Sequence, residues 1–510
     1  MKNITAFALA AAAAIYFFFA TAKNTEVRAV HADESEQAFT FLKLYEGKGY
    51  KYNPYGPHGP ALYYWAYAAQ KPQEIPAEKI EIAQLRKCLL PAAAALGAAY
   101  FALAGTLGAA ACALAAAVFF ASPIAQIYSV YFVHEILFAL ACFLCTAAAF
   151  FFLKKPSAAR AAAAGFAAGA AQCCKETSVI AFAAIFAAAV LVKIAFKNPE
   201  DARETQSPRR YALFAFAALA GFAAVLVPLY SSFGTNFGGV ADAFKSYFIH
   251  FFSKADSAEI AGEGLFYAKL LFWQKSGGAY FGGYFATALA LLGTFWAFAK
   301  RRERGADAAA FFAVAALVQI VILSFIKYKT PWLLLAPTAA MCVPAGYALA
   351  KILSLRARLA IPALALVAAA FVPQYKMSRN ATERFADDPR NPLIYSHTVR
   401  DEKNLEARIA ECVKFSEYSA EIPVAFVGEV SPWPLPWAMR NMPNAGFWRK
   451  PPDNLDKFDV IITDAFAAPK TLKKFDRKKY VGDMFGLRKN TILNVFIKKE
   501  LFDKITGEKL

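Results

Sequence analysis

Charged residues are scarce in this chain. Only 18% of its 510 residues are Asp, Glu, Lys or Arg, and 58% are hydrophobic, whereas soluble domains carry roughly 25% charged residues. The composition excludes a soluble globular protein and indicates an integral membrane protein. The net charge of +18 does not indicate nucleic-acid binding, because the basic residues stand in short clusters between apolar runs or in the C-terminal tail.

Cysteine is also sparse, with eight residues scattered along the chain. A disulfide framework is not expected, because most of the cysteines fall in or at the ends of apolar segments. These are Cys88, Cys112, Cys142, Cys145, Cys173, Cys174 and Cys342. Cys142 and Cys145 form a C-x-x-C inside such a segment without a redox-type βαβ context, so we interpret them as small packing residues.

Long apolar runs are abundant. The first, at residues 4–22, ends in a signal-peptidase-like "ATA", but it is long enough to cross a bilayer and we expect it to be retained. Further runs occur at 88–104, 106–121, 136–153, 160–173, 178–195, 211–230, 280–299, 307–326, 331–350 and 358–373. The sequence therefore predicts a mainly α-helical, polytopic bundle of about eleven transmembrane helices.

The basic clusters predict the orientation of the bundle. With a cytoplasmic N-terminus, four loops fall inside, and all four are basic: "KKPSAAR", "KNPEDARETQSPRR", "KRRERGAD" and "KILSLRAR". This is the pattern of the positive-inside rule. We therefore expect a multi-pass protein of the cytoplasmic (inner) membrane, whose loops 23–85 and 231–279 lie on the outer face.

The C-terminal tail differs in composition from the rest. After a transmembrane domain over residues 1–373, the charge rises and the apolar runs shorten to strand length in "PVAFVG", "DVIITD" and "TILNVFI", with a helical spacing in "DEKNLEARIAECVKF". Residues 374–510 are thus expected to form a small α/β domain on the outer face. The prolines of "SPWPLPWAMR" predict a rigid aromatic loop rather than a regular helix.

The candidate functional residues are polar side chains on the predicted outer face. The sequence has no Walker-type phosphate loop and no G-x-G-x-x-G, and "HEILF" is not H-E-x-x-H. What the outer loops carry instead is a mixture of acids, histidines and lysines: Asp33, Glu34, His58, His134, Glu135, Lys175, Glu176, Lys327 and Lys329. Such a mixture suits a reaction between a lipid with an anionic headgroup and a neutral acceptor, in which lysines balance a phosphate and a carboxylate accepts a proton.

Two outer-loop stretches carry a family resemblance. "HADESEQAF" and "YKYNPYGPHGPALYYWAY" resemble the first outer loop of GT-C fold membrane glycosyltransferases, the superfamily of the dolichyl-phosphate-mannose protein mannosyltransferases and the aminoarabinose transferases. The resemblance implies an acidic catalytic base just after the first helix and a polyprenyl-phosphate-linked sugar as donor.

The chain is most similar to one branch, the flippase activity-associated proteins of N-glycosylation pathways. The similar segments lie at 53–64, 127–138, 175–180, 230–240, 328–332, 391–398 and 432–440. The branch usually has a basic residue shortly before the acidic one near position 135, whereas this chain has Val133 and His134. A phosphate-binding role at that position is therefore not implied.

Each site residue has a structural alternative. Asp33 is predicted as general base and Glu34 as its helper or an acceptor ligand, although both could simply form a solvated loop. Tyr55, His58 and Tyr63 are predicted to bind substrate, although the tyrosines also suit an interfacial aromatic belt.

The remaining candidates lie further along the chain. Glu135 is either a second acidic site residue or a favourable charge at a helix N-terminus. Lys175 either lies at the outer edge of the membrane or pairs with an anion. With Lys327 and Lys329, which could instead merely snorkel, it is predicted to bind the lipid phosphate.

The predicted function is transfer of a sugar, with inversion, from a polyprenyl-phosphate-linked donor to a protein, lipid or glycan acceptor at the outer face. The alternative is a flippase-associated or translocation factor for lipid-linked glycans without transferase activity; the absence of a visible internal repeat favours the enzyme. No nucleic-acid partner is expected. The metal requirement stays open, with Asp33, Glu34 and Glu135 as candidate oxygen ligands for a divalent cation.

Overall fold

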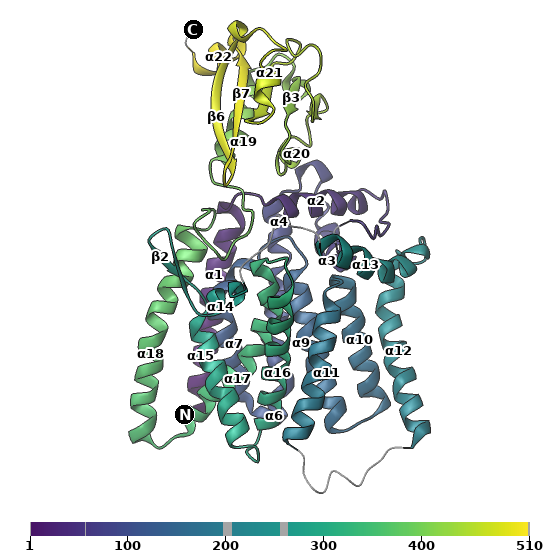
Figure 1. Cartoon of the computed structure of the whole chain (residues 1–510), viewed down its shortest axis with the longest axis vertical. Coiled ribbons are helices and arrows are strands. Elements are labelled where there is room, and N and C mark those ends of the chain that lie inside the picture. Colours follow the sequence, from purple (N-terminus) through teal and green to yellow (C-terminus); the bar gives the residue numbers. More distant parts are fainter. Residues whose placement is uncertain (1, 57, 197–206, 256–263, 508–510) are drawn as a thin grey trace.

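The computed structural model describes residues 2–56, 58–196, 207–255 and 264–507. Within them, a bundle of upright helices carries a smaller domain on one end, and the N-terminus lies at the opposite end (Figure 1). We call the domain-bearing end the upper end. The basic loop expected at 197–210 and the loop expected at 231–279 lie partly outside the described residues.

The bundle contains all the apolar segments that the sequence marks out. Its helices are α1 (Lys2–Val27), α4 (Ile82–Lys87), α5 (Leu90–Ala99), α6 (Ala104–Leu107), α7 (Ala109–Ala121), α9 (Glu135–Lys154), α10 (Ala158–Cys174), α11 (Ser178–Ala195), α12 (Pro208–Tyr230), α15 (Tyr284–Ala299), α16 (Ala306–Phe325), α17 (Leu335–Ser354) and α18 (Ala357–Arg379). The break expected near residue 105 falls at Gly108, whose φ of +90° favours glycine.

Eight helical segments of the described residues are long and apolar enough to cross a membrane. The shorter α7, α10 and α15 stand among them in the bundle (Figure 1). The sequence predicts about eleven spans, whereas eight helices of the described part of the chain qualify by length and composition. The difference is α7, α10 and α15, which have 13, 17 and 16 residues, fewer than the roughly 20 residues of an upright span. The chain is a multi-pass membrane protein.

Close helix packing depends on small residues. α17 belongs to the most buried of the eight long apolar segments, and it packs against α7, α9, α15 and α16. α10 and α12 approach so closely that a Cβ added at Gly165 or Gly169 would meet the backbone of Ala218 or Phe222. Gly165 and Gly169 form a G-x-x-x-G, the pattern that lets transmembrane helices meet backbone to backbone.

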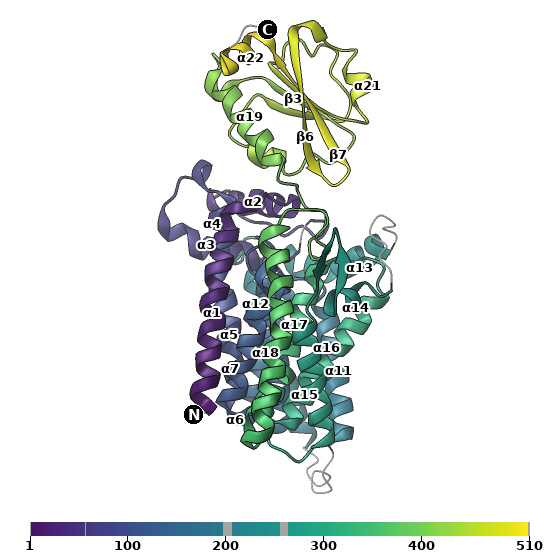
Figure 2. The ribbon, with the colours of Figure 1, turned by 90° about the vertical axis from the view of Figure 1, so that its left-hand side faces the viewer.

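Shorter elements form the upper end of the bundle. They are α2 (Ala32–Tyr45), α3 (Ala61–Gln70), α8 (Pro123–Tyr128), α13 (Gly238–Ala255), α14 (Phe266–Leu271) and a hairpin of β1 (Gln274–Ser276) and β2 (Ala279–Phe281). α2 lies across the end of the bundle, beneath the C-terminal domain (Figures 1 and 2). Pro60 directly precedes α3.

The C-terminal domain is a five-stranded mixed sheet with helices. Its elements are α19 (Glu402–Phe415), β3 (Val424–Val427), α20 (Leu435–Ala438), β4 (Ala445–Trp448), β5 (Val460–Asp464), α21 (Ala468–Thr471), β6 (Tyr480–Arg488), β7 (Thr491–Lys498) and α22 (Lys499–Thr506). The strand order is β4-β3-β5-β7-β6, parallel in its first three strands and antiparallel in the rest. The three predicted strands and the predicted helix are confirmed.

Two expectations about the tail need adjustment. The segment "SPWPLPWAMR" contains a one-turn helix, α20, because Pro434 is its N-cap and Pro436 lies in its first turn, where a missing N–H costs nothing. α18 continues past residue 373 to Arg379, and residues 381–393 still contribute to the core of the bundle, whereas the second core begins at Leu405. A connector of residues 385–401 therefore joins the bundle to the domain.

Candidate functional site

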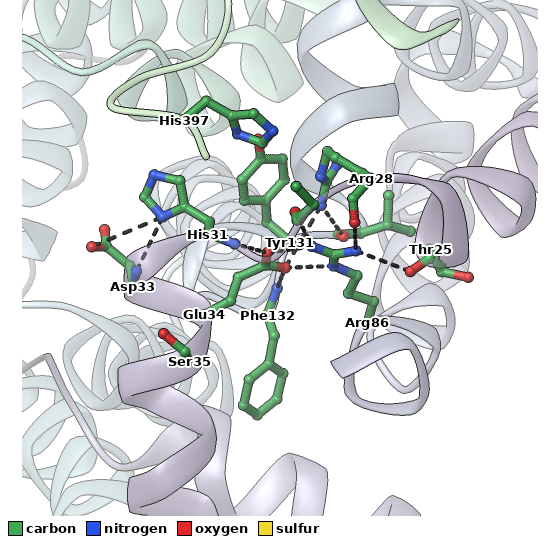
Figure 3. A network of polar contacts seen from close by, with 12 residues as sticks. Thr25, Arg28, His31, Asp33, Glu34, Ser35, Arg86, Tyr131, Phe132 and His397 are labelled. Carbon is green, nitrogen blue, oxygen red and sulfur yellow. Dashed lines mark hydrogen bonds and ion pairs between the residues drawn. The ribbon is translucent and has the colours of Figure 1, made fainter. Parts of the chain in front are cut away.

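Asp33 lies in the first turn of α2, directly after the first membrane helix, and its side chain is 46% exposed. The helix begins here because His31 caps it (Figure 3). The Asp33 backbone N–H donates to His31 Nδ1 at 3.1 Å, and the His31 backbone N–H donates to Glu34 Oε2 at 3.0 Å. This reciprocal capping box determines where α2 starts and fixes the backbone from which the Asp33 side chain projects.

Glu34, although adjacent, is fully buried in a polar network. Arg86 donates from Nε to Oε1 at 2.8 Å and from Nη2 to Oε2 at 2.5 Å, and the Phe132 N–H donates to Oε1 at 2.9 Å. Arg28 Nη2 stands 3.6 Å from Oε1. The other N–H groups of Arg86 donate to carbonyls at the end of α1, those of Thr25, Arg28 and Ala29.

The charge of Glu34 is determined by this network. Burial raises the pKa of its carboxyl, but the charge and hydrogen bonds of Arg86, the charge of Arg28 and the Phe132 N–H outweigh burial and lower the pKa to about 2. The carboxylate is ionised at neutral pH and holds together α2, α4, the end of α1 and the segment between α8 and α9. Its predicted part in the chemistry stays a prediction, and its contacts are those of a residue that positions others.

Aromatic rings surround the His31 imidazole. The ring centroids of Tyr131, Trp332 and His397 lie 5.9, 6.0 and 6.0 Å from that of His31. His397 Nδ1 is 3.0 Å from the Tyr131 hydroxyl, and His31 Nε2 is 2.8 Å from the Tyr395 carbonyl oxygen. The sequence does not mark Tyr131, Trp332, Tyr395 or His397 as site residues, although all four lie in family-like segments, at 127–138, 328–332 and 391–398.

Tyr328, in the turn after α16, feels the charges of Asp33 and of Glu135, which belongs to a second polar cluster. Burial raises the pKa of Tyr328, and the charges of Asp33 and Glu135 raise it further. Both carboxylates therefore lie within electrostatic reach of one hydroxyl. The turn "KYKTP", which the sequence predicts at a helix end, carries this hydroxyl just after α16.

The second cluster contains two acid–base pairs at the upper ends of α9 and α10. Glu135 and Lys175, 4% and 3% exposed, form an ion pair, so the anion beside Lys175 is a carboxylate of the protein itself. The Nδ1 atom of His58 lies 3.0 Å from both Glu176 carboxylate oxygens. His134 is buried against His58, with Nε2 2.8 Å from the Gly59 carbonyl oxygen.

The three predicted phosphate-binding lysines are not equivalent. Lys175 is buried in its pair with Glu135. Lys329 is also buried and donates to three carbonyls at the end of α16, those of Leu323, Ser324 and Ile326. Lys327 is exposed. Only Lys327 therefore presents its ammonium group to the surroundings.

The two predicted tyrosines also differ. Tyr55 is 79% exposed, on the loop before α3. Tyr63 is fully buried, and its hydroxyl donates to Gln37 Oε1 on α2. Tyr63 thus supports the helix that carries Asp33, whereas Tyr55 is free to contact a substrate or a membrane surface.

The C-terminal domain contacts α2 through its proline-rich segment. The Phe39 ring lies 5.6 Å from that of Trp433 and 5.5 Å from that of Trp437. Arg440 donates to Glu81 Oε1 at 2.8 Å and to the Ile80 carbonyl at 3.0 Å. The domain therefore rests on the helix that carries Asp33 in its first turn.

The described residues contain no group of three or more His, Cys, Asp or Glu side chains that could hold a metal ion. Two of the carboxylates suggested as oxygen ligands already have basic partners: Glu34 is bound by Arg86, and Glu135 by Lys175.

No protein-family model and no curated protein matches the chain, but solved structures do. ArnT from Cupriavidus metallidurans, bound to undecaprenyl phosphate, aligns with a TM-score of 0.63 at 13% identity, over 96% of this chain and 97% of ArnT. The oligosaccharyltransferase AglB from Archaeoglobus fulgidus, in complex with an inhibitory peptide and a dolichol-phosphate, aligns at 0.54 and 13% identity, over 98% of this chain and 77% of AglB.

A second structure of the Archaeoglobus fulgidus oligosaccharyltransferase, tethered to an acceptor peptide with the NVT sequon, aligns with a TM-score of 0.56 at 14% identity, over 98% of this chain and 76% of that one. These proteins are GT-C fold glycosyltransferases. Similarity at this level of identity establishes the fold. The chain has the GT-C fold, as its first outer loop led us to expect.

Proposed function

We propose that this protein is a membrane glycosyltransferase that transfers a sugar from a polyprenyl-phosphate-linked donor to an acceptor. The observation that carries the proposal is the position of Asp33: a half-exposed carboxylate at the start of α2, on a GT-C bundle, beside a buried and fully paired Glu34. Solved neighbours bound to undecaprenyl phosphate and dolichol-phosphate support a lipid phosphate as the carrier.

Asp33 acts as the general base. It takes the proton of the acceptor nucleophile as that oxygen or nitrogen attacks the anomeric carbon of the sugar. The bond between the anomeric carbon and the phosphate oxygen breaks, polyprenyl phosphate leaves with the electron pair, and the configuration inverts. Lys327, Lys175 and Lys329 are the predicted phosphate ligands; the exposure of Lys327 supports its part in this set.

The reaction takes place at the outer face of the membrane. This orientation rests on the positive-inside pattern: the basic loops that begin at Lys154 and Lys300 follow the lower ends of α9 and α15, opposite to Asp33. The C-terminal domain, which rests on α2, then lies outside the membrane and next to the acceptor.

Replacement of Asp33 tests the proposal. Purified protein in lipid vesicles is given a polyprenyl-phosphate sugar and an acceptor, and Asp33→Asn is compared with Glu74→Gln, which neutralises an exposed carboxylate of the same upper segment. We expect Asp33→Asn to lower kcat by about 10²- to 10⁴-fold and Glu74→Gln to leave it unchanged. Wild-type turnover by folded Asp33→Asn would refute the mechanism, and lipid-glycan movement without transfer would favour a translocation factor.

A further inference from the structure

The two ring nitrogens of His31 have different partners, and together they determine its tautomer. The Asp33 backbone N–H can only donate, so Nδ1, which accepts it at 3.1 Å, carries no proton. The proton of the neutral ring is therefore on Nε2, which donates to the Tyr395 carbonyl oxygen at 2.8 Å. One imidazole thus joins the backbone of Asp33 to the connector.

The ring has little freedom to move. It is 2% exposed and packs against the rings of Tyr131, Trp332 and His397. In addition, Nδ1 stands 3.9 Å from the Asp33 carboxylate Oδ1. A displacement of the His31 ring would therefore displace the first turn of α2 and the carboxylate beside it.

The connector that holds Nε2 is anchored at both ends. On the bundle side, the Tyr128 hydroxyl donates to the Leu393 carbonyl at 2.6 Å. On the domain side, Thr398 forms a bridge to Arg488, and the Val399 N–H donates to the Leu487 carbonyl at 3.1 Å, both on β6. Only two residues separate Tyr395 from this contact with the C-terminal sheet.

We propose that His31 is a positioning residue for Asp33 and that the connector, through the Tyr395 carbonyl, sets its position, so that docking of the C-terminal domain is coupled to the catalytic base. The inference rests on the proposed function. It assigns His31 no contact with substrate: the imidazole acts on the reaction by holding α2 and Asp33 in place.

Two substitutions separate the roles of the two nitrogens. In His31→Asn, the amide oxygen replaces Nδ1 and still caps α2, since asparagine is a favoured N-cap, but the side chain is too short to reach Tyr395. In His31→Gln, the amide nitrogen replaces Nε2 and keeps the Tyr395 contact, while the cap is lost. Ser157→Ala is the matched control, because it removes the side-chain cap of α10 at the lower end of the bundle.

The readouts are kcat, the donor KM and hydrogen exchange at residues 391–398. Misplacement of a catalytic group by about 1 Å costs up to about a hundredfold in rate. We expect His31→Asn to lower kcat about ten- to a hundredfold with donor KM unchanged, and to speed exchange of the connector. Ser157→Ala should leave all three readouts unchanged, and His31→Gln should lower kcat.

Three results would overturn the proposal. Wild-type kcat in His31→Asn would make His31 a helix cap and no more. A raised donor KM with unchanged kcat would make it a binding residue. Unchanged exchange at 391–398 would disconnect it from the connector. The exchange readout needs no turnover, so it remains informative if wild-type protein transfers no sugar, a result that would refute the proposed function instead.

Discussion

Glu34→Gln tests whether the buried acid of the pair is structural or chemical. Oε1 accepts from Arg86 and Phe132, and Oε2 accepts from Arg86 and the His31 N–H. Whichever oxygen becomes an NH₂ group in glutamine faces two donors, and the buried guanidinium of Arg86 loses its counter-charge. Breaking a buried ion pair in this way costs about 3–5 kcal/mol of folding free energy.

The pKa leads to a similar magnitude. A carboxyl pKa lowered from 4.5 to about 2 corresponds to about 3 kcal/mol, at about 1.4 kcal/mol per unit. We therefore expect unfolding in detergent micelles to show a loss of about 3–5 kcal/mol for Glu34→Gln. Arg86→Met should cost a similar amount, and the double variant should cost clearly less than the sum, because the uncompensated charge is gone.

The opposite result is equally informative. If Glu34→Gln unfolds like the wild type while sugar transfer is abolished, the carboxylate has a chemical role, and our account of the network as structural is wrong. Additive costs in the double variant would also contradict it, since additivity is expected only of residues that do not interact.

Three further predictions concern the same end of the bundle. The pKa of Glu34 in the folded protein lies below its ordinary value of 4.5. Its ionised carboxylate therefore contributes fully to folding stability above pH 4.5, and this contribution is lost as the pH falls toward 2. Wild-type stability measured between pH 5 and pH 3 should thus fall more steeply than that of Glu34→Gln. Lys175→Met strands buried Glu135 and should cost about 3–5 kcal/mol in the same unfolding assay, and a second change, Glu135→Leu, should restore most of it; no restoration would refute the pairing. Arg440→Ala should loosen the C-terminal domain and speed proteolysis of the connector, and an unchanged cleavage rate would show that this contact does not hold the domain.

The fold could be predicted largely from local patterns along the chain. Apolar runs mark the membrane helices because an apolar environment requires apolar side chains over a fixed length. Strand-length runs after residue 420 and helical spacing over α19 marked the C-terminal domain for the same kind of reason. The number of full-length spans was less predictable. α7, α10 and α15 are shorter than a full span, and their place in the bundle depends on packing against neighbouring helices.

The site could be predicted only in part, and the reason is the separation of its members in sequence. "HADE" by itself determined that two acids follow the first helix, but not that one is half exposed and the other enclosed. That difference comes from Arg86, 52 residues away, just as the position of His31 depends on Tyr395, 364 residues away. Such pairings arise from tertiary packing of helix ends, where burial makes an unpaired charge or donor costly, and no local periodicity encodes which partners meet.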